Sequence, residues 1–295
     1  MAPKDKDAVE LTAASEEKKK DTAGKNKQDD GAIVNPDDNL SEEDKELKER
    51  LETCVTTVSD KSLQTGLRMQ ALEIIVTELR TSTSSMTSVP KPLKFLRPHY
   101  NVLKALYTPL SEKTGLGSDD LEFRARLADV LAVLAMTMAK PEERASLKFK
   151  LGATKDYDAL RASSKKEVPA ASENLGSWGH EFVRSLAGEI GEEYQSRVIA
   201  GADPTQDAPF QDLLDMVDVI APFHVTHNAE AEAVDLLIEV QRLKKLLGLT
   251  AIDENNYGRI CLYLVKTADF MSDPEDYVVS KMEQDLFFAQ NKHRC

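Results

Sequence analysis

The sequence predicts an all-α fold, an irregular α-solenoid-like array of helical hairpins that follows a disordered N-terminal tail. Three observations lead to this prediction. Apolar residues recur at helical spacing through most of the 295 residues, no run of strand length alternates apolar and polar residues, and short turns separate the helical segments. Because the segments are too dissimilar to define a repeat period, we expect an irregular array of about eight to ten helices.

The chain divides into four parts by composition. Residues 1–39 carry mixed charges and almost no large apolar side chains, so we expect a disordered charged tail without an assigned function. Residues 40–152 are predicted to form the first helical hairpins. Residues 153–174, which are rich in Ser, Ala and Lys and contain Pro169, are predicted to be a surface insertion. Residues 175–295 are predicted to form a second helical segment.

The first hairpin begins at Ser41, whose hydroxyl is placed to cap a helix with Asp44 three residues later. The small hydroxyl residues of 81–85 are expected to end its second helix. Both helices show an apolar stripe at helical spacing. The first stripe is Leu47, Leu51, Cys54, Val55 and Val58, and the second is Leu63, Leu67, Ala71, Ile74, Ile75 and Leu79.

A shaped connector is predicted at residues 86–92, because Pro90 and Pro92 lack backbone donors and favour an extended path. A third helix is expected to carry Phe95, Leu96, Val102, Leu103 and Leu106. Pro98 must then lie in its first turn, or the helix must begin later. The turn-rich residues 108–118 are expected to separate it from the next helix.

A fourth helix at about residues 119–139 is apolar on nearly every face toward its end and should be fully buried. A short amphipathic segment around Leu147 and Phe149 follows. Beyond Trp178, two helices are predicted on either side of the break at residues 204–209. Their apolar positions are Phe182, Val183, Leu186 and Ile190 in the first, and Leu213, Leu214, Met216, Val217 and Ile220 in the second.

Three further helices are predicted toward the C-terminus. Asn228 is expected to cap a helix that Gly248 closes, Asp253 is expected to cap the next, and Pro274 is placed to begin the last. The apolar positions of these helices are Ala233, Leu236, Leu237, Val240, Leu243 and Leu247, then Tyr257, Ile260, Cys261, Leu264 and Ala268, then Val278, Met282 and Leu286.

Composition excludes several classes of function. With 51 acidic and 38 basic residues the formal net charge is −13, which disfavours binding to nucleic acid or to an anionic membrane surface. The longest apolar run is far shorter than the roughly 18 residues that span a bilayer. Cys54, Cys261 and Cys295 include no close pair, so we expect free thiols in a reducing compartment. The charged N-terminus resembles no signal peptide, and we expect a cytoplasmic and nuclear protein.

No catalytic motif stands out. His224, His227 and Glu230 have a spacing that metal ligands use, so a metal-dependent hydrolase is one alternative, although helix capping at Asn228 accounts for the same residues. His180 and Glu181 are adjacent on a helix and point in different directions. The glycines at 188 and 191 match no nucleotide-binding pattern and indicate close helix packing. We therefore expect no enzyme, no cofactor and no metal.

Residues 82–100, STSSMTSVPKPLKFLRPHY, resemble the N-terminal region of the largest non-ATPase subunits of the 26S proteasome, the regulatory subunit 2 family of the 19S base. Further segments resemble the same family in the same order, from about residue 40 to about residue 270. They are LSEEDKE at 40–46, VLAMTM at 133–138, GSWGHEFVRSLAGE at 176–189, HNAEAEAVDLL at 227–237 and CLYL at 261–264. Residues 277–295 differ from the pattern expected for the family.

This resemblance implies a non-catalytic scaffold that docks on the ATPase ring of the regulatory particle and acts in ubiquitin-dependent protein degradation. Its implied partners are the base ATPases and other regulatory-particle subunits. In the family, ubiquitin and ubiquitin-like shuttle receptors bind to a later toroid of repeats. We expect this chain to be truncated before those repeats, so ubiquitin recognition is expected only if they are present. A stand-alone truncated helical adaptor is the main alternative.

The candidate partner contact lies within residues 86–100, in and just after the proline-containing connector. There Lys91, Lys94, Phe95 and Arg97 are placed to present basic and aromatic groups to an acidic helical partner. In the alternative interpretation, Phe95 and Leu96 pack inward and the lysines are only solvated.

Overall fold

The computed structural model describes residues 40–83, 89–163 and 175–268, and within these residues all regular secondary structure is helical. The all-α prediction is confirmed. The tail at 1–39 and the helix expected from Pro274 lie outside the described residues. The α-helices are α1 (Glu42–Ser59), α2 (Thr65–Thr83), α3 (Lys91–Leu96), α4 (Tyr100–Ser111), α5 (Ser118–Met138), α6 (Ala145–Ser163), α7 (His180–Ile199), α8 (Gln211–Thr226), α9 (Glu230–Glu239) and α10 (Tyr257–Thr267).

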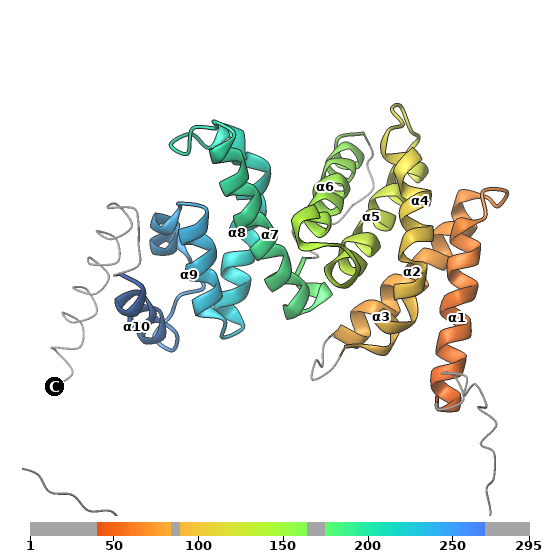
Figure 1. Cartoon of the computed structure of the whole chain (residues 1–295), viewed down its shortest axis with the longest axis horizontal. Coiled ribbons are helices and arrows are strands. Elements are labelled where there is room, and N and C mark those ends of the chain that lie inside the picture. The colour runs from red at the N-terminus through yellow and green to blue at the C-terminus, as the bar shows by residue number, and fades with distance from the viewer. Residues whose placement is uncertain (1–39, 84–88, 164–174, 269–295) are drawn as a thin grey trace, which may run out of the picture. The chain divides into compact units, whose positions relative to one another are not determined.

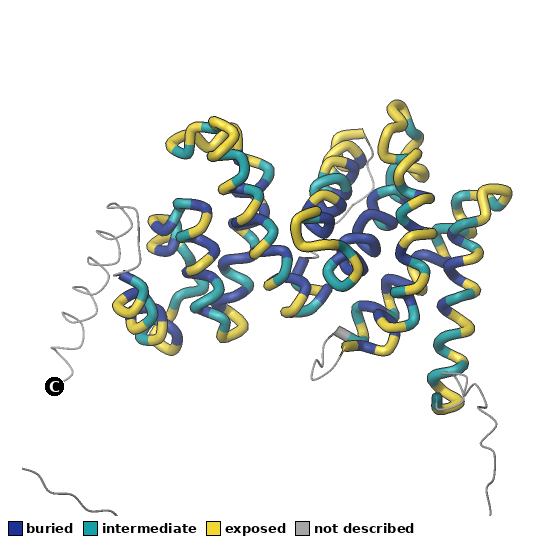
Figure 2. The backbone as a smooth tube through the Cα atoms, in the orientation of Figure 1, coloured by how far each residue is buried: buried dark blue, intermediate teal, exposed yellow. Residues whose placement is uncertain are grey.

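The helices from Ser41 onward pack chiefly on their neighbours along the chain. The pairs α1–α2, α5–α6 and α8–α9 make extensive contacts, while α2 also packs on α5, and α7 on α5, α6, α8 and α9. Figure 1 shows this succession of hairpins from α1 to α10. Buried residues line the facing sides of the helices in one continuous core (Figure 2). The predicted array of hairpins is therefore present.

The helix α1 begins as the sequence predicts. The Ser41 hydroxyl accepts a hydrogen bond of 3.2 Å from the backbone N–H of Asp44, and three acidic residues occupy the first turn, where the helix dipole favours them. Four residues of the predicted stripe are buried, namely Leu51, Cys54, Val55 and Val58, and Leu47 packs at the edge of the core.

The predicted stripe of α2 is partly wrong. Leu63 precedes the helix, and Leu67 and Ile74 remain 50% and 42% exposed. The face that α2 turns toward α1 and α5 is rotated relative to the prediction. It buries Ala71, Leu72, Ile75, Val76 and Leu79.

The predicted third helix is divided into two. Lys91–Leu96 form the short helix α3. A 3₁₀ turn at Arg97–His99, with Pro98 near its start, follows it, and α4 begins at Tyr100. A proline is tolerated in such a first turn because the N–H that it lacks would have no helical partner. The turn region expected from residue 108 begins later, because α4 continues through Pro109 to Ser111.

The predicted burial of α5 is confirmed for its middle but not for its end, where Met138 is 39% exposed. The prediction for the next segment is wrong. Every residue from 127 to 135 of α5 is buried. The segment 153–163, which we expected in a surface insertion, forms the second half of α6 and buries Ala153, Asp156 and Leu160. Residues 164–174, the rest of the expected insertion, lie outside the described part of the chain.

The helices α7 and α8 bury all nine predicted apolar positions. The expected roles of Asn228 and Gly248 are wrong. Asn228 adopts a left-handed backbone conformation (φ 60°), and Ala229 is the N-cap of α9. That helix ends at Glu239, and Gly248 instead ends the 3₁₀ segment Leu243–Gly248. Asp253 accepts the backbone N–H groups of Asn255 and Asn256 in the turn before α10, whose N-cap is Asn256.

Candidate partner-contact site

Of the connector predicted at residues 86–92, residues 86–88 lie outside the described residues, and the extended path is wrong for Lys91 and Pro92, which already belong to α3. Pro90 is the N-cap of α3 with ψ at 141°, and both Pro90 and Pro92 are buried. Leu93 and Leu96 are also buried, against α1 and α2. The position of α3 is therefore set by an apolar face, and its polar side chains lie on the opposite face.

Lys91 pairs with the chain's own first helix. Its Nζ lies 2.8 Å from Asp44 Oδ1, and the lysine side chain stays 62% exposed while that of Asp44 is 14% exposed. The hydrogen bond from Lys91 lowers the pKa of the Asp44 carboxyl. A partner that recruits Lys91 must therefore compete with Asp44.

The other three predicted contact residues differ in their surroundings. Lys94 is exposed, and its side chain has no hydrogen bond or ion pair with any described residue. Phe95 is half-buried and packs against the core. Arg97 is half-buried as well, and its Nε donates a 3.2 Å hydrogen bond to Thr137 Oγ1 of α5. The basic groups share one region, whereas the aromatic ring turns inward, and the partner contact stays a prediction.

The three candidate metal ligands do not meet. His224 lies within α8 and is 1% exposed. Glu230 forms an ion pair with Arg259 from α10. The ring Nδ1 of His227 is 2.7 Å from the carbonyl oxygen of Phe223, to which it can donate. In the described ranges no three His, Cys, Asp or Glu side chains are arranged to hold a metal ion.

His224 occupies an unusual environment instead. Neither of its ring nitrogens has a hydrogen-bond partner, and the Phe223 ring lies beside both it and His227. Burial lowers the pKa of His224 to about 4, since desolvation penalises the imidazolium. The group is therefore a neutral imidazole near pH 7.

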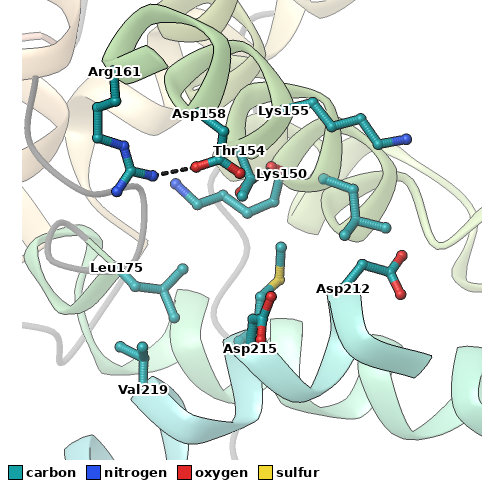
Figure 3. Close-up of a pocket in the computed structure, with 11 residues that line it drawn as sticks. Lys150, Thr154, Lys155, Asp158, Arg161, Leu175, Asp212, Asp215 and Val219 are labelled. Atoms are coloured by element: carbon teal, nitrogen blue, oxygen red, sulfur yellow. Dashed lines mark hydrogen bonds and ion pairs between the residues drawn. The ribbon is translucent and has the colours of Figure 1, made fainter. Parts of the chain in front are cut away.

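A cavity of about 280 Å³ lies between α6 and α8 (Figure 3). Leu151, Leu175, Met216 and Val219 supply apolar walls. Basic side chains come from α6 and carboxylates from both helices, and Asp158 pairs with Arg161 across one turn. Positive and negative groups of this cavity largely balance, so its electrostatics select no charged ligand. The sequence did not reveal it, because α6 was expected to end before Ala153.

Buried charges on α5 and α6 were also missed by the sequence analysis, and one of them, Lys150, lines this cavity. Lys150 forms an ion pair with Asp129, and Arg124 binds Asp156 through two hydrogen bonds of 2.7 and 2.6 Å. Tyr157 donates to the second oxygen of Asp129, and burial together with that carboxylate raises the pKa of the phenol. In the sequence, such buried ion pairs are indicated only by charged residues that recur at helical spacing on both helices. These bonds fasten α6 to α5.

Comparisons with known proteins identify relatives of the chain. The family model described as RPN1 N-terminal domain matches residues 51–294. That match includes residues 277–294, which the sequence analysis had set apart from the family. No helix among the described residues has the length and apolar character required to cross a membrane.

Three relatives illustrate the similarity. The chain is 43% identical over 238 residues to the 26S proteasome non-ATPase regulatory subunit 2 homolog A of Arabidopsis thaliana, covering 81% of this chain and 23% of that protein. It is 40% identical over 257 residues to the 26S proteasome non-ATPase regulatory subunit 2 of Dictyostelium discoideum, covering 87% and 25%. It is 36% identical over 259 residues to the 26S proteasome regulatory subunit rpn-1 of Neurospora crassa, covering 88% and 25%. The chain spans about a quarter of the length of these relatives.

Proposed function

Because this chain belongs to the RPN1 N-terminal domain family, we propose that it acts as a non-catalytic helical scaffold in the regulatory particle of the 26S proteasome. The observation that carries the proposal is the family match, which extends over residues 51–294. The relatives are named as non-ATPase regulatory subunits, which supports a role in holding other subunits.

The packing of the helices supports a rigid scaffold, which resists deformation when other subunits bind to it. Consecutive helices share one core from α1 to α10, and buried ion pairs join α5 to α6. Close-packed interiors resist deformation, so a force applied to one hairpin is passed to the next. A module of this kind is suited to holding bound subunits at fixed relative positions.

The proposed partners are other subunits of the regulatory particle, including the ATPases of its base, and the proposed location is the cytoplasm and the nucleus. Ubiquitin binding is not part of the proposal, because the family resemblance assigns it to a later region of repeats. The proposed contact with the ATPases includes the connector cations Lys91, Lys94 and Arg97. Lys94 supports this best, since its amine is exposed and unengaged by the described residues.

Affinity purification of the tagged chain from its native cytosol, followed by mass spectrometry, tests the scaffold role. We expect recovery of the base ATPases together with other regulatory-particle subunits. Sedimentation provides an independent measure, because an incorporated chain travels with a megadalton particle. Recovery of the chain alone, near its mass of 32.7 kDa, would instead support the stand-alone adaptor.

The connector contact has its own test within that experiment. We expect Lys91→Ala, Lys94→Ala and Arg97→Ala combined to reduce co-purification of the ATPases. The triple variant Lys140→Ala, Lys148→Ala and Lys155→Ala removes the same charge from α6 and the turn before it and serves as the control. If the connector variant recovers the ATPases as fully as the control does, the contact is elsewhere.

A further inference from the structure

Two exposed histidines meet where α7 begins and α8 ends. His180 is the first residue of α7, and His227 is the C-cap of α8. Their ring centroids lie 4.6 Å apart, and their ring planes are inclined by 76° to each other. Because both side chains are exposed, an ion in the solvent reaches the two rings without any opening of the fold.

The chain before α7 is shaped to bring these two rings together. Gly179, the N-cap of α7, has a φ of 89°, which an L side chain rarely adopts. A methyl group at Gly176 would collide with the Phe223 ring of α8, so the close approach of the turn to α8 requires glycine. The centroid of the Phe223 ring lies 5.1 Å from that of His180 and 4.1 Å from that of His227. Both imidazoles are therefore held beside one aromatic ring.

The surroundings of His227 determine which of its ring nitrogens is available. Its Nδ1 lies 2.7 Å from the carbonyl oxygen of Phe223, and an acceptor at that distance needs a donor, so Nδ1 carries the proton of the neutral ring. The Thr226 hydroxyl, 3.1 Å from the same nitrogen, donates to backbone carbonyls and can accept from it too. The Nε2 atom then bears the lone pair. Histidines that bind metals are commonly oriented in this way, by an acceptor on the other ring nitrogen.

The donor atoms and their spacing select the kind of ion. Neutral imidazoles suit Cu²⁺, Ni²⁺ and Zn²⁺, whereas Mg²⁺ and Ca²⁺ prefer oxygen ligands. Two imidazoles that bind one ion at about 2.0–2.1 Å have ring centroids about 4.5–5.2 Å apart, for bond angles of about 90–110°. The 4.6 Å between His180 and His227 lies in this range. The exposed ring of His180 can also rotate about its Cβ–Cγ bond, whose torsion is soft, and aim a nitrogen at the ion.

We propose that His180 and His227 form a two-ligand site for one divalent transition-metal ion, with water in the remaining coordination positions. The pair shares only His227 with the triplet that the sequence suggested, since His224 is buried and Glu230 is bound by Arg259. An ion held by both rings links the start of α7 to the end of α8, so it stabilises the folded chain according to its affinity. The inference does not depend on the proposed scaffold role.

The test titrates Ni²⁺ alone into the full 295-residue chain and follows binding by calorimetry. The reference chain carries His293→Ala and Cys295→Ser, because these two metal donors lie outside the described residues. We expect one ion to bind per chain, Cu²⁺ to bind more tightly than Ni²⁺, and Mg²⁺ not to bind at the same concentrations. Binding of Ni²⁺ should weaken at least about tenfold between about pH 7.5 and 5.5, because a protonated imidazole does not coordinate a metal.

Single and double variants distinguish a shared ion from two histidines that bind separately. We expect His180→Ala and His227→Ala each to weaken Ni²⁺ binding at least about tenfold, because one imidazole alone loses the effective concentration of the second. The double variant should then bind at most about threefold more weakly than either single variant, since both ligands act as one unit. His99→Ala, at a half-exposed position in the turn before α4, is the control and should leave the affinity unchanged.

Two results would overturn the proposal. Losses that add in the double variant would mean that each histidine binds an ion of its own. Equal affinities in all variants, or binding of Mg²⁺ that salt weakens, would mean an adventitious ion only, held by the carboxylates of an acidic chain. Thermal unfolding verifies that each variant is folded without metal. Added Ni²⁺ should raise the melting temperature of the reference chain but not that of the double variant.

Discussion

Lys150 and Asp129 form an ion pair inside the protein, with 2.6 Å between Nζ and Oδ1 and side chains that are 2% and 5% exposed. The pair joins α6 to α5, and Tyr157 OH donates to the remaining oxygen of the carboxylate at 2.9 Å. Each charge is therefore compensated locally. Removing one member leaves the other buried without a counter-charge, which costs more than the pair itself contributes.

We predict that Lys150→Met lowers the free energy of unfolding by about 3–5 kcal/mol. Lys148→Met is the matched control, because Lys148 lies on the same helix and is exposed, and its cost should be below about 0.5 kcal/mol. Urea denaturation followed by circular dichroism measures both. A cost for Lys150→Met as small as that of the control would show that Asp129 finds another partner.

Arg124 connects three parts of the chain. It binds both oxygens of Asp156, and its Nη1 donates to the carbonyl oxygens of Leu110 and Lys113 at 2.7 and 2.8 Å. Lysine cannot reproduce these diverging bonds, so Arg124→Lys should cost about 2–3 kcal/mol. The same variant should speed amide hydrogen exchange at residues 110–116, while Arg161→Lys, at an exposed pair, should not. Unchanged exchange in that turn would contradict the role of Arg124.

Two glycines of α7 should respond in opposite directions to the same substitution. A methyl group at Gly191 would collide with the Glu239 side chain of α9, whereas one at Gly188 meets no atom within 4 Å. Alanine favours the helix interior, so Gly188→Ala should raise stability by about 0.5–1 kcal/mol. Gly191→Ala should lower it by about 1–2 kcal/mol through overpacking, and Glu239→Ala should restore the loss. Thermal melts of the three variants test the order.

The buried imidazole of His224 should make the fold sensitive to acid. Burial lowers its pKa from the ordinary 6.5 to about 4. Glu232 acts in the opposite direction, while His180, Arg184 and His227 act in the same direction as burial. The unfolded chain therefore takes up a proton first as pH falls below 6.5. The contribution of His224 to the free energy of unfolding is therefore complete above pH 6.5 and is lost progressively as the pH falls toward 4. The loss is on the order of 3 kcal/mol.

His224→Leu should flatten the dependence of unfolding free energy on pH between 6.5 and 4, whatever its effect on absolute stability. His99→Leu, at a half-exposed position, serves as the control and should preserve the slope. Denaturant midpoints measured at intervals across this window give both slopes. Equal slopes for the two variants would show that other groups govern the acid sensitivity.

The helices that the sequence predicted well are those in which local signals and burial agree. The cap at Ser41 and the apolar run of α5 are examples, because neither depends on a distant partner. The predicted helix near Leu147 was cut short at Ala153 because the buried face of α6 includes Lys150 and Asp156. Those residues read as polar in sequence, and only their partners on α5 allow them to be buried.

The candidate partner-contact site likewise combines features that the local sequence predicts with contacts that only the tertiary structure reveals. The sequence indicated basic groups beside a proline-containing connector, and in the structure Lys91 and Lys94 belong to α3 while Arg97 belongs to the 3₁₀ turn after it. The sequence did not predict that Lys91 pairs with Asp44 or that Arg97 donates to Thr137, because these partners lie 47 and 40 residues away along the chain. The metal hypothesis failed for a related reason, because Arg259 binds Glu230 from a different helix.

The sequence by itself determined the helical class, the order of most helices and the family, because periodicity, caps and segment composition are local properties of the chain. Tertiary structure decided which face of α2 is outward and which charges are buried. The rotation of α2 that exposes Leu67 and Ile74 follows from its simultaneous packing on α1 and α5. That choice depends on the shapes of both neighbours, and a periodic pattern within one helix does not contain them.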